Sequence, residues 1–253
     1  MLFRNLYIFL LLCHWLNGES TSNSPPISTF SIIARDIKTG ELGIAVQSKF
    51  IAVGSVVPYA NSEIGAIASQ AFGNVRYGPQ GINLLKQGKS PKEALEILIS
   101  SDPLREHRQV GIINMYGDAS NYTGSKCLPW AGAKIGNHYS VQGNLLNGPQ
   151  VINAMAEDFE KTRGNLAERL ISSLHAGQKN GGDKRGKQSA AILIVRKGWG
   201  YGGMNDRFRD LRVDDHPNPI KELERIYKLH KKIFPRPDSK TNPKTFIKKI
   251  KDK

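Results

Sequence analysis

Cysteine is scarce in this chain, and no stretch of it is apolar for long. Only Cys13 and Cys127 occur among 253 residues, and Cys13 falls in the N-terminal leader described next, which excludes a framework of internal disulfides. Cys127 is expected to be a small buried packing residue rather than a nucleophile. The apolar run at 6–16 is shorter than the roughly 20 residues that span a bilayer, which argues against a membrane anchor.

The first 20 residues have the layout of a signal peptide. Arg4 precedes the apolar run, and Gly18-Glu19-Ser20 is a small-x-small sequence that a signal peptidase can cut after Ser20. We therefore predict a signal peptide over residues 1–20, a Ser/Pro linker over 21–28, one folded domain over 29–234, and a secreted or periplasmic location.

The chain carries a formal charge of +14, and half of this excess lies near the C-terminus. Nine Lys or Arg and two Asp occur over residues 231–253, and Pro235, Pro237 and Pro243 interrupt any long helix there. Residues 235–253 are therefore predicted to be a basic, disordered tail. Such a tail can hold the protein at an anionic envelope surface, although solvation explains the charge equally well. No recognised nucleic-acid module accompanies it, so no specific nucleic-acid partner is expected.

Hydrophobic patterning predicts strands in hairpins and helices in pairs. The predicted strands are 29–36, 41–48, 55–60, 65–70, 109–115, 119–123, 189–195 and 208–213, with a short extended piece at Tyr201. The predicted helices are 79–87, a helix that opens at Ser90-Pro91 and ends at Asp102-Pro103, 150–162, 165–178 and 220–233. Because strands and helices do not alternate one by one, a doubly wound parallel sheet is disfavoured. The pattern favours an α+β fold with two antiparallel sheets covered by helix pairs.

Seven stretches, in order along the chain, carry a resemblance to a known family. They are 29–32 (TFSI), 40–46 (GELGIAV), 74–79 (NVRYGP), 107–109 (HRQ), 142–144 (QGN), 181–189 (GGDKRGKQS) and 211–217 (LRVDDHP). On these residues the chain resembles the bacterial domain of unknown function DUF1028, which is placed in the N-terminal-nucleophile (Ntn) hydrolase superfamily. The resemblance implies a four-layer α-β-β-α sandwich, and it implies little about the substrate.

The same resemblance implies that Thr29 stands where the superfamily has its nucleophile, at the head of the first strand. In that chemistry the hydroxyl attacks an amide carbon while the free α-amine of the same residue, with a reference pKa of about 7.7–8.0, takes the proton. Ser31 faces the same side two residues on. Cleavage after Ser20 leaves residues 21–28 ahead of Thr29, and no second cleavage signal precedes Thr29. The alternative, that Thr29 is an ordinary β-branched strand residue, therefore stays open.

Further candidates end the second strand and lie in the resembling loops. Ser48 and Lys49 close the second strand, where Lys49 either lowers the pKa of a neighbour or is simply the polar end of the strand. Arg in a Gly-bounded loop suits capture of a carboxylate or phosphate, although turn chemistry alone explains the glycines. The substrate-binding candidates are Asn74, Arg76, Tyr77, Arg108, Gln142, Asn144, Asp183 and Arg185.

Two carboxylates and an imidazole, Asp214, Asp215 and His216, follow the last predicted strand. These residue types suit acid–base, metal or substrate contacts. Adjacent strand residues point to opposite faces, which argues against a shared metal ion. We expect one Asp to cap the following helix and the other to act electrostatically, and we expect no metal or cofactor.

Two functions are consistent with these features. The first is an exported amide-bond hydrolase that acts on a small amide or a peptide-like substrate. The alternative is a non-catalytic, envelope-associated binding protein on the same fold, in which Arg76, Arg108, Asp183 and Arg185 line a polar pocket. The sequence leaves a homo-oligomer open in either case.

Overall fold

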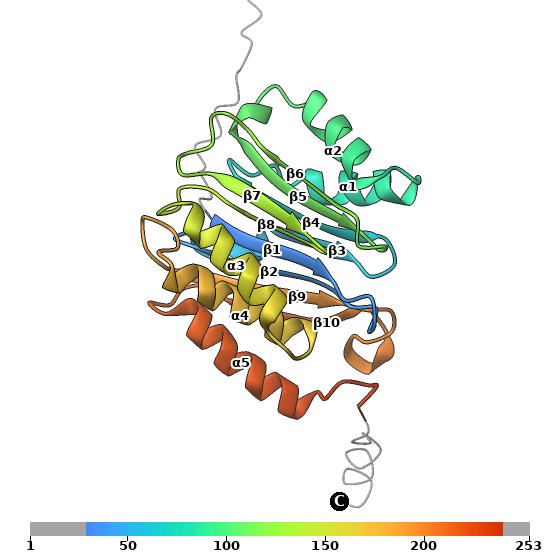
Figure 1. Ribbon diagram of the computed structural model, residues 1–253. Coiled ribbons are helices and arrows are strands. Elements are labelled where there is room, and N and C mark those ends of the chain that lie inside the picture. The colour runs from blue at the N-terminus through green and yellow to red at the C-terminus, as the bar shows by residue number, and fades with distance from the viewer. Residues whose placement is uncertain (1–28, 240–253) are drawn as a thin grey trace, which may run out of the picture.

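The computed structural model describes residues 29–239 (Figure 1). The predicted signal peptide, the linker and residues 240–253 lie outside this range. The strands are β1 (Thr29–Arg35), β2 (Leu42–Ser48), β3 (Pro58–Asn61), β4 (Gly65–Ala71), β5 (Arg108–Asn114), β6 (Ala119–Thr123), β7 (Gly132–Gly136), β8 (Tyr139–Gly143), β9 (Ser189–Val195) and β10 (Arg207–Val213). The helices are α1 (Tyr77–Lys86), α2 (Pro91–Ser100), α3 (Pro149–Lys161), α4 (Leu166–Lys179) and α5 (Pro219–Ile233), with short 3-10 turns η1 (Val53–Ser55), η2 (Arg105–His107) and η3 (Tyr201–Gly203).

The strands form two sheets, and every strand pair is antiparallel. One sheet has the order β10-β9-β2-β1-β8-β7 and the other the order β3-β4-β5-β6. In the larger sheet β1 lies between β2 and β8, with Thr29 opposite Ser48 and Ser31 opposite Gln142. The expectation of a mixed α+β fold with two antiparallel sheets is confirmed.

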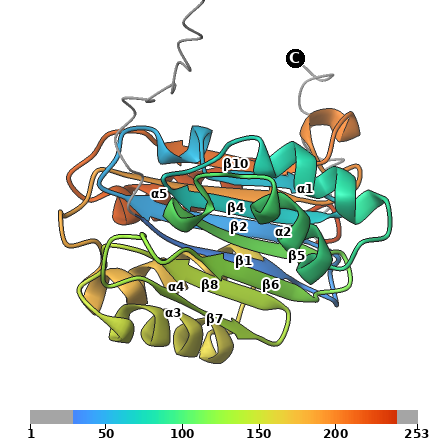
Figure 2. The ribbon, with the colours of Figure 1, turned by 90° about the horizontal axis from the view of Figure 1, so that it is seen from above.

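The sheets face each other, and helices cover their outer faces (Figures 1 and 2). Helices α3, α4 and α5 pack on the larger sheet through a core that includes Phe30, Phe159 and Leu170. Helices α1 and α2 pack on the smaller sheet around Ile67 and Ile112. A third apolar cluster fills part of the space between the sheets. Every β1 residue from Thr29 to Ala34 is consequently buried, which explains why this strand reads as a continuous apolar and hydroxyl-bearing run.

Helix α2 begins where the capping signal predicts. The Ser90 hydroxyl accepts a hydrogen bond from the Glu93 backbone N–H at 3.3 Å, and the Glu93 carboxylate accepts one from the Ser90 N–H at 2.8 Å. Pro91 occupies the first turn, where its missing N–H costs nothing. Asn165 and Glu168 form the same reciprocal cap at the start of α4.

One hairpin was missed and two local predictions were wrong. The hairpin of β7 and β8 was not predicted: β7 begins and ends with glycine, and the apolar–polar alternation of β8 covers only Tyr139 to Gln142. Tyr201 lies in η3 and not in a strand. The first part of the predicted strand 55–60 belongs to η1, so that β3 begins only at Pro58.

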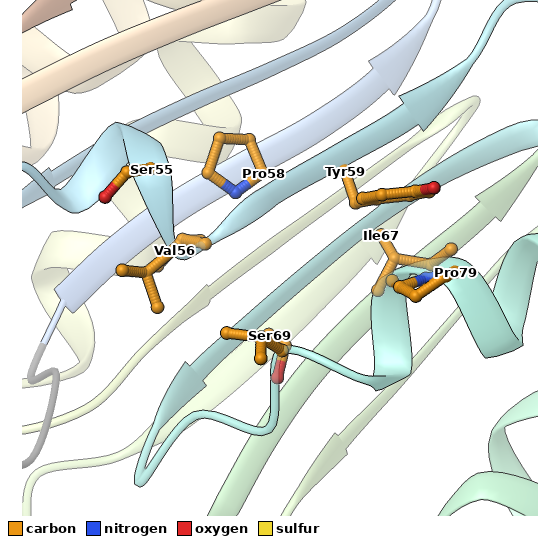
Figure 3. Close-up of a pocket in the computed structure, with 10 residues that line it drawn as sticks. Ser55, Val56, Pro58, Tyr59, Ile67, Ser69 and Pro79 are labelled. Carbon is orange, nitrogen blue, oxygen red and sulfur yellow. The ribbon is translucent and has the colours of Figure 1, made fainter. Parts of the chain in front are cut away.

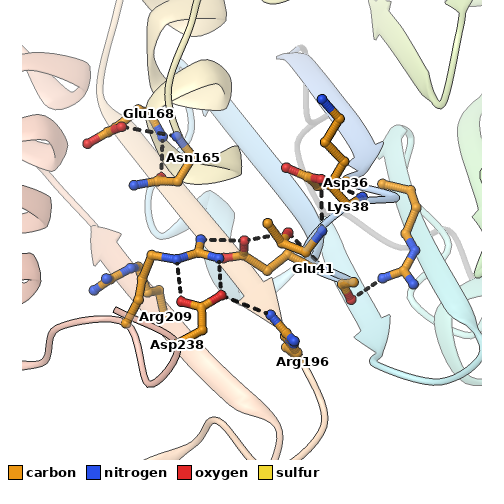
Figure 4. A network of polar contacts seen from close by, with 12 residues as sticks. Asp36, Lys38, Glu41, Asn165, Glu168, Arg196, Arg209 and Asp238 are labelled. Carbon is orange, nitrogen blue, oxygen red and sulfur yellow. Dashed lines mark hydrogen bonds and ion pairs between the residues drawn. The ribbon is translucent and has the colours of Figure 1, made fainter. Parts of the chain in front are cut away.

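Residues 235–239, which we call the C-terminal strap, contact the turn between β1 and β2 (Figure 4). Arg236 forms an ion pair with Glu41, which is 1% exposed, and a second ion pair with Asp238. Asp238 also pairs with Arg196 at 3.4 Å, and the Arg236 and Arg196 guanidinium groups both lie over the Trp199 ring. The segment that the sequence assigns to the tail therefore starts with residues that are tied to the domain.

Removing the Arg236 side chain should destabilise the domain through Glu41. Arg236→Met keeps the aliphatic volume but leaves a buried carboxylate without its ion-pair partner, a loss of ~3 kcal/mol in the free energy of unfolding. Urea unfolding measures the difference. Lys197→Met is the matched control, because Lys197 and Glu63 pair with both side chains more than half exposed, and it should cost no more than ~0.5 kcal/mol. Equal losses in the two variants would show that the strap pair contributes no more than a surface pair.

Candidate functional site

The space between the sheets has an apolar half and a polar half. The apolar half is formed by residues such as Ile33, Ile44 and Ile113. The polar half, which we call the polar seam, lies at the Thr29 end of β1. Its members are Thr29, Ser31, Ser48, Gln70, Gln109, Ser140, Gln142 and Asn144, each at most 1% exposed. The seam thus consists of hydroxyls and carboxamides and contains no ionisable side chain.

Strand alternation explains how the sequence places these groups. In β1 the side chains of Phe30 and Ile32 belong to the core under the helices, so Thr29 and Ser31 face the other sheet. In β4 the inward positions are Ala66, Ala68 and then Gln70. Both strands change from apolar to polar inward residues at the same end of the sandwich.

The carboxamides connect the two sheets through a continuous hydrogen-bond network. Ser31 Oγ donates to Gln70 Oε1 at 2.6 Å and accepts from Gln142 Nε2 at 2.7 Å. Gln109 Oε1 accepts from Gln70 Nε2 at 2.8 Å and from Asn144 Nδ2 at 3.0 Å. None of the seam side chains has a buried polar atom without a partner. Such a satisfied network fixes the side chains in one arrangement.

Thr29 lies at the edge of the seam in a row of hydroxyls. Its Oγ1 donates to Ser48 Oγ at 3.1 Å, and the strand register places Ser48 opposite Ser189 on β9. On its other side the Thr29 carbonyl accepts the Asn144 backbone N–H at 3.0 Å. The structure therefore brings together four predicted site residues, Thr29, Ser31, Ser48 and Asn144, and adds Gln142 through Ser31.

The loop after α4 packs beside this end of β1 and β2. Asp183 is buried, and its carboxylate accepts the Lys49 backbone N–H at 3.1 Å and pairs with Arg185 at 2.8 Å. The Lys184 N–H donates to the carbonyl of Leu145, next to Asn144, at 3.0 Å. Asp183 and Arg185 thus hold the loop at the rim of the seam, whereas the Lys49 side chain is exposed.

A second group of predicted residues gathers around Asp102 on the outer side of the smaller sheet. One oxygen of the Asp102 carboxylate accepts hydrogen bonds from Asn74 at 3.1 Å, from Tyr77 at 2.8 Å and from Arg108 at 2.8 Å. Arg108 also donates to the Phe72 carbonyl. These three predicted substrate-binding side chains therefore hold the 72–77 loop onto β5.

This arrangement shifts the pKa of the Asp102 carboxyl and the pKa of the Tyr77 phenol. Burial alone would raise the pKa of Asp102, but the hydrogen bonds from Arg108, Tyr77, the Leu104 N–H and Asn74 outweigh it and lower the pKa to about 2. Burial and the neighbouring Asp102 carboxylate raise the pKa of the Tyr77 phenol. Asp102 is consequently a permanently charged anchor at neutral pH.

The remaining predicted residues are not brought into the seam. Arg76 is exposed, and its backbone N–H donates to Asn74 Oδ1. Asp215 accepts a hydrogen bond from Gln188 at 3.1 Å. The expected Asp cap of α5 is wrong: the helix begins after Asn218, and His216 Nδ1 accepts the Asn218 N–H at 2.9 Å. Within residues 29–239, no three His, Cys, Asp or Glu side chains are placed to hold a metal ion.

Cys127 is buried, as the sequence predicts. Burial raises the pKa of its thiol to about 11, although a hydrogen bond from the Gly124 backbone opposes the shift. At neutral pH this thiol is protonated, which makes it a poor nucleophile.

A separate cavity of about 270 Å³ opens between β3, β4 and the start of α1 (Figure 3). Pro58, Tyr59, Ile67 and Pro79 are among the ten residues that line it. Ile67 faces the helix-covered side of β4, whereas Gln70 faces the seam, so the sheet separates this cavity from the seam.

Sequence reasoning missed Gln70, Gln109 and Asp102. The two glutamines occupy inward positions of strands that are otherwise apolar on that face, and this break in the pattern is the signal that could have found them. Asp102 was assigned to the end of a helix, and nothing in the local sequence connects it with Arg108.

Replacing Asp102 by Asn should destabilise the domain in a pH-dependent way. The folded pKa lies below the unfolded value of about 3.9, so the ionised carboxylate stabilises the fold above about pH 4 and loses this effect as the pH falls towards 2. We expect Asp102→Asn to cost ~2–3 kcal/mol at pH 7, and the gap to wild type to narrow below about pH 4. Denaturant unfolding from pH 7 to pH 3 measures both. Glu157→Gln, which removes a surface pair with Lys161, should show neither effect, and a gap independent of pH would contradict the assignment.

Comparison with known proteins places this architecture in a family. The crystal structure of protein SPO2555 from Silicibacter pomeroyi, a DUF1028 protein, is similar with a TM-score of 0.75 and 30% sequence identity, over 81% of this chain and 86% of that chain. No curated protein is similar enough to count as a match. The family model of DUF1028, a family of unknown function, matches residues 29–223, from the head of β1 into α5. The chain therefore belongs to the DUF1028 family.

Proposed function

We propose that this protein is an exported amide-bond hydrolase of the N-terminal-nucleophile type, with Thr29 as its nucleophile. The facing sheets with helices on their outer sides support the four-layer α-β-β-α sandwich of that superfamily. The position of Thr29 at the head of a central strand supports its assignment as the nucleophile. The substrate class is a small amide or a peptide-like molecule.

The observation that carries the proposal is the absence of a base among the seam residues. Thr29 lies among hydroxyls and neutral carboxamides, none of which can take a proton from its hydroxyl at neutral pH. An α-amine on Thr29 itself, with a reference pKa of about 7.7–8.0, supplies that base without any further residue. The hydrolase therefore requires cleavage of the bond between Ser28 and Thr29.

The chemistry then follows in balanced steps. Thr29 Oγ bonds to the substrate carbonyl carbon, and its proton moves to the α-amine. The Asn144 side-chain amide is the candidate donor to the oxyanion, since it lies in the same network beside Thr29. Collapse breaks the C–N bond, the leaving amine takes the proton from the α-ammonium, and water hydrolyses the ester to release the acid. No cofactor is required.

The mature N-terminus and two matched variants of Thr29 test the proposal. The intact mass of the exported protein should correspond to a chain that begins at Thr29. A β-lactone probe should acylate Thr29 Oγ, as located by peptide mass spectrometry. Thr29→Val keeps the β-branched shape but removes the hydroxyl, and it should lose labelling and at least about a thousandfold of any amide turnover. Thr29→Ser keeps the hydroxyl and should retain both. Turnover by a chain that still carries residues 21–28 would contradict the mechanism.

The full burial of Thr29 favours the alternative, a binding protein that keeps the sandwich without turnover. In that case Thr29 and Ser48 only hold the edge of the seam, and the charged groups at the rim, such as Asp183 and Arg185, contact the ligand. A mature chain that begins at Thr21, with no β-lactone labelling, would support this function over the first.

A further inference from the structure

The cavity between β3, β4 and the start of α1 offers a ligand mainly apolar surface. No charged side chain is among the ten residues that line it. The two serine hydroxyls of the lining, those of Ser55 and Ser69, already donate hydrogen bonds to backbone carbonyls at 2.7 and 3.0 Å. The aliphatic and aromatic faces of Pro58, Tyr59 and Pro79 surround the space between them (Figure 3). The part of a ligand that enters this cavity is therefore expected to be apolar.

Both walls of the cavity are anchored by contacts outside it. One wall is β3, whose pairing with β4 fixes its position. The other wall belongs to the 74–79 stretch, which Asn74 ties to the Asp102 carboxylate at 3.1 Å. A Cβ on Gly78 would lie 2.7 Å from Tyr59 Cγ, so glycine at this position lets the Tyr59 ring lie against α1. The cavity is consequently formed before any ligand arrives.

The volume of the cavity sets the size of the ligand. An apolar cavity of roughly 150 Å³ takes one benzene molecule. The cavity beside β3 measures about 270 Å³. A fused bicyclic ring system is therefore of the right size, and filling the space supplies the van der Waals contacts that a void forfeits.

A guanidinium group without an ion-pair partner accompanies the cavity. Arg76 follows Val75, which lines the cavity and is 59% exposed, so this part of the wall lies at the mouth. The Arg76 side chain is exposed and forms no ion pair with any residue of the described chain. Arginine binds a carboxylate through two parallel hydrogen bonds. One guanidinium balances the single charge of a carboxylate, whereas a phosphate monoester carries a charge of about −1.5 to −2. The pattern of charge therefore favours a monocarboxylate.

We propose that this cavity binds a small aromatic carboxylate. The ring system enters between Tyr59 and Pro79, and the carboxylate pairs with Arg76 at the mouth. The ligand would lie on the helix-covered face of β4, whereas Gln70 and the seam lie on the other face. The inference therefore stands whether or not Thr29 is catalytic. It also gives the 74–79 stretch, which the seam does not use, a role in binding.

Binding of 2-naphthoate to the full-length exported chain tests the proposal. Isothermal titration should show a single 2-naphthoate per chain. The neutral isostere 2-naphthamide should bind at least about tenfold more weakly, because it cannot form the charge-assisted pair with Arg76. Arg76→Gln should weaken 2-naphthoate at least about tenfold and leave 2-naphthamide unchanged. Val75→Trp fills the mouth of the cavity and should weaken both ligands at least about tenfold.

The matched control is Arg163→Gln, which removes an exposed arginine from the turn between α3 and α4, over the larger sheet. This variant should bind 2-naphthoate like wild type, and thermal unfolding without ligand confirms that each variant is folded. The proposal fails if wild type does not bind 2-naphthoate, if 2-naphthamide binds equally well, or if Val75→Trp binds unchanged. Equal losses in Arg163→Gln and Arg76→Gln would also contradict it, because the ligand would then respond only to net charge.

Discussion

The fold depends on one constraint, which is that the carboxamides buried between the two sheets must satisfy one another. Leaving a buried amide unpaired costs free energy, so the complete network stabilises Gln70, Gln109 and Gln142 between the sheets. Their hydrogen bonds cross from β4 and β5 to β1 and β8 and therefore fix how the two sheets sit against each other. The network also requires glycine at position 111, since a Cβ on Gly111 would lie 2.4 Å from Gln142 Oε1 and would displace that side chain. Gln47, buried on the helix-covered side of β2, lacks such a network, and both of its side-chain polar atoms have no hydrogen-bond partner.

The buried charged side chains of the described chain lie outside this network. The buried charged residues of the described chain are Glu41, Asp102, Arg108, Asp183 and Arg209. Asp102 and Arg108 lie on the helix-covered side of the smaller sheet, Asp183 lies in the rim loop, and Glu41 lies at the β1–β2 turn. Each of these carboxylates has a guanidinium partner, so the ion pairs hold the loops and the strap around the sandwich. Arg209 lies on the helix-covered side of β10 beside His230 and Tyr227 of α5, outside the polar seam.

The sequence predicts the parts of the structure that rest on local rules. The Ser90 and Asn165 helix starts, the β1–β2 hairpin and the antiparallel pairing follow from capping and alternation. β8 was missed because its apolar–polar alternation covers only Tyr139 to Gln142 and its partner β7 begins and ends with glycine. The site is predicted only in part. Thr29, Ser31 and Ser48 share one face of the β1–β2 hairpin, which strand alternation predicts. The hydrogen bonds of Ser31 with Gln70 and of Gln70 with Gln109 come from the packing of strands that are distant in the sequence. The sequence groups Asn74, Tyr77 and Arg108 as substrate-binding residues, and the structure does bring them together. Their shared partner is the Asp102 carboxylate, which lies outside every motif, so the sequence could not show that they hold a loop onto β5.

The neutral seam limits the acid–base chemistry that its side chains can supply. The hydroxyls and carboxamides of the seam are not bases at neutral pH, so none of the seam side chains can take the proton of the Thr29 hydroxyl. The charged groups nearest to the seam are Asp183 and Arg185 in the rim loop, at the same end of β1 as Thr29. The strap holds the opposite end of β1 through Glu41, so a change at the strap reaches Thr29 through the hydrogen-bonded sheets between them.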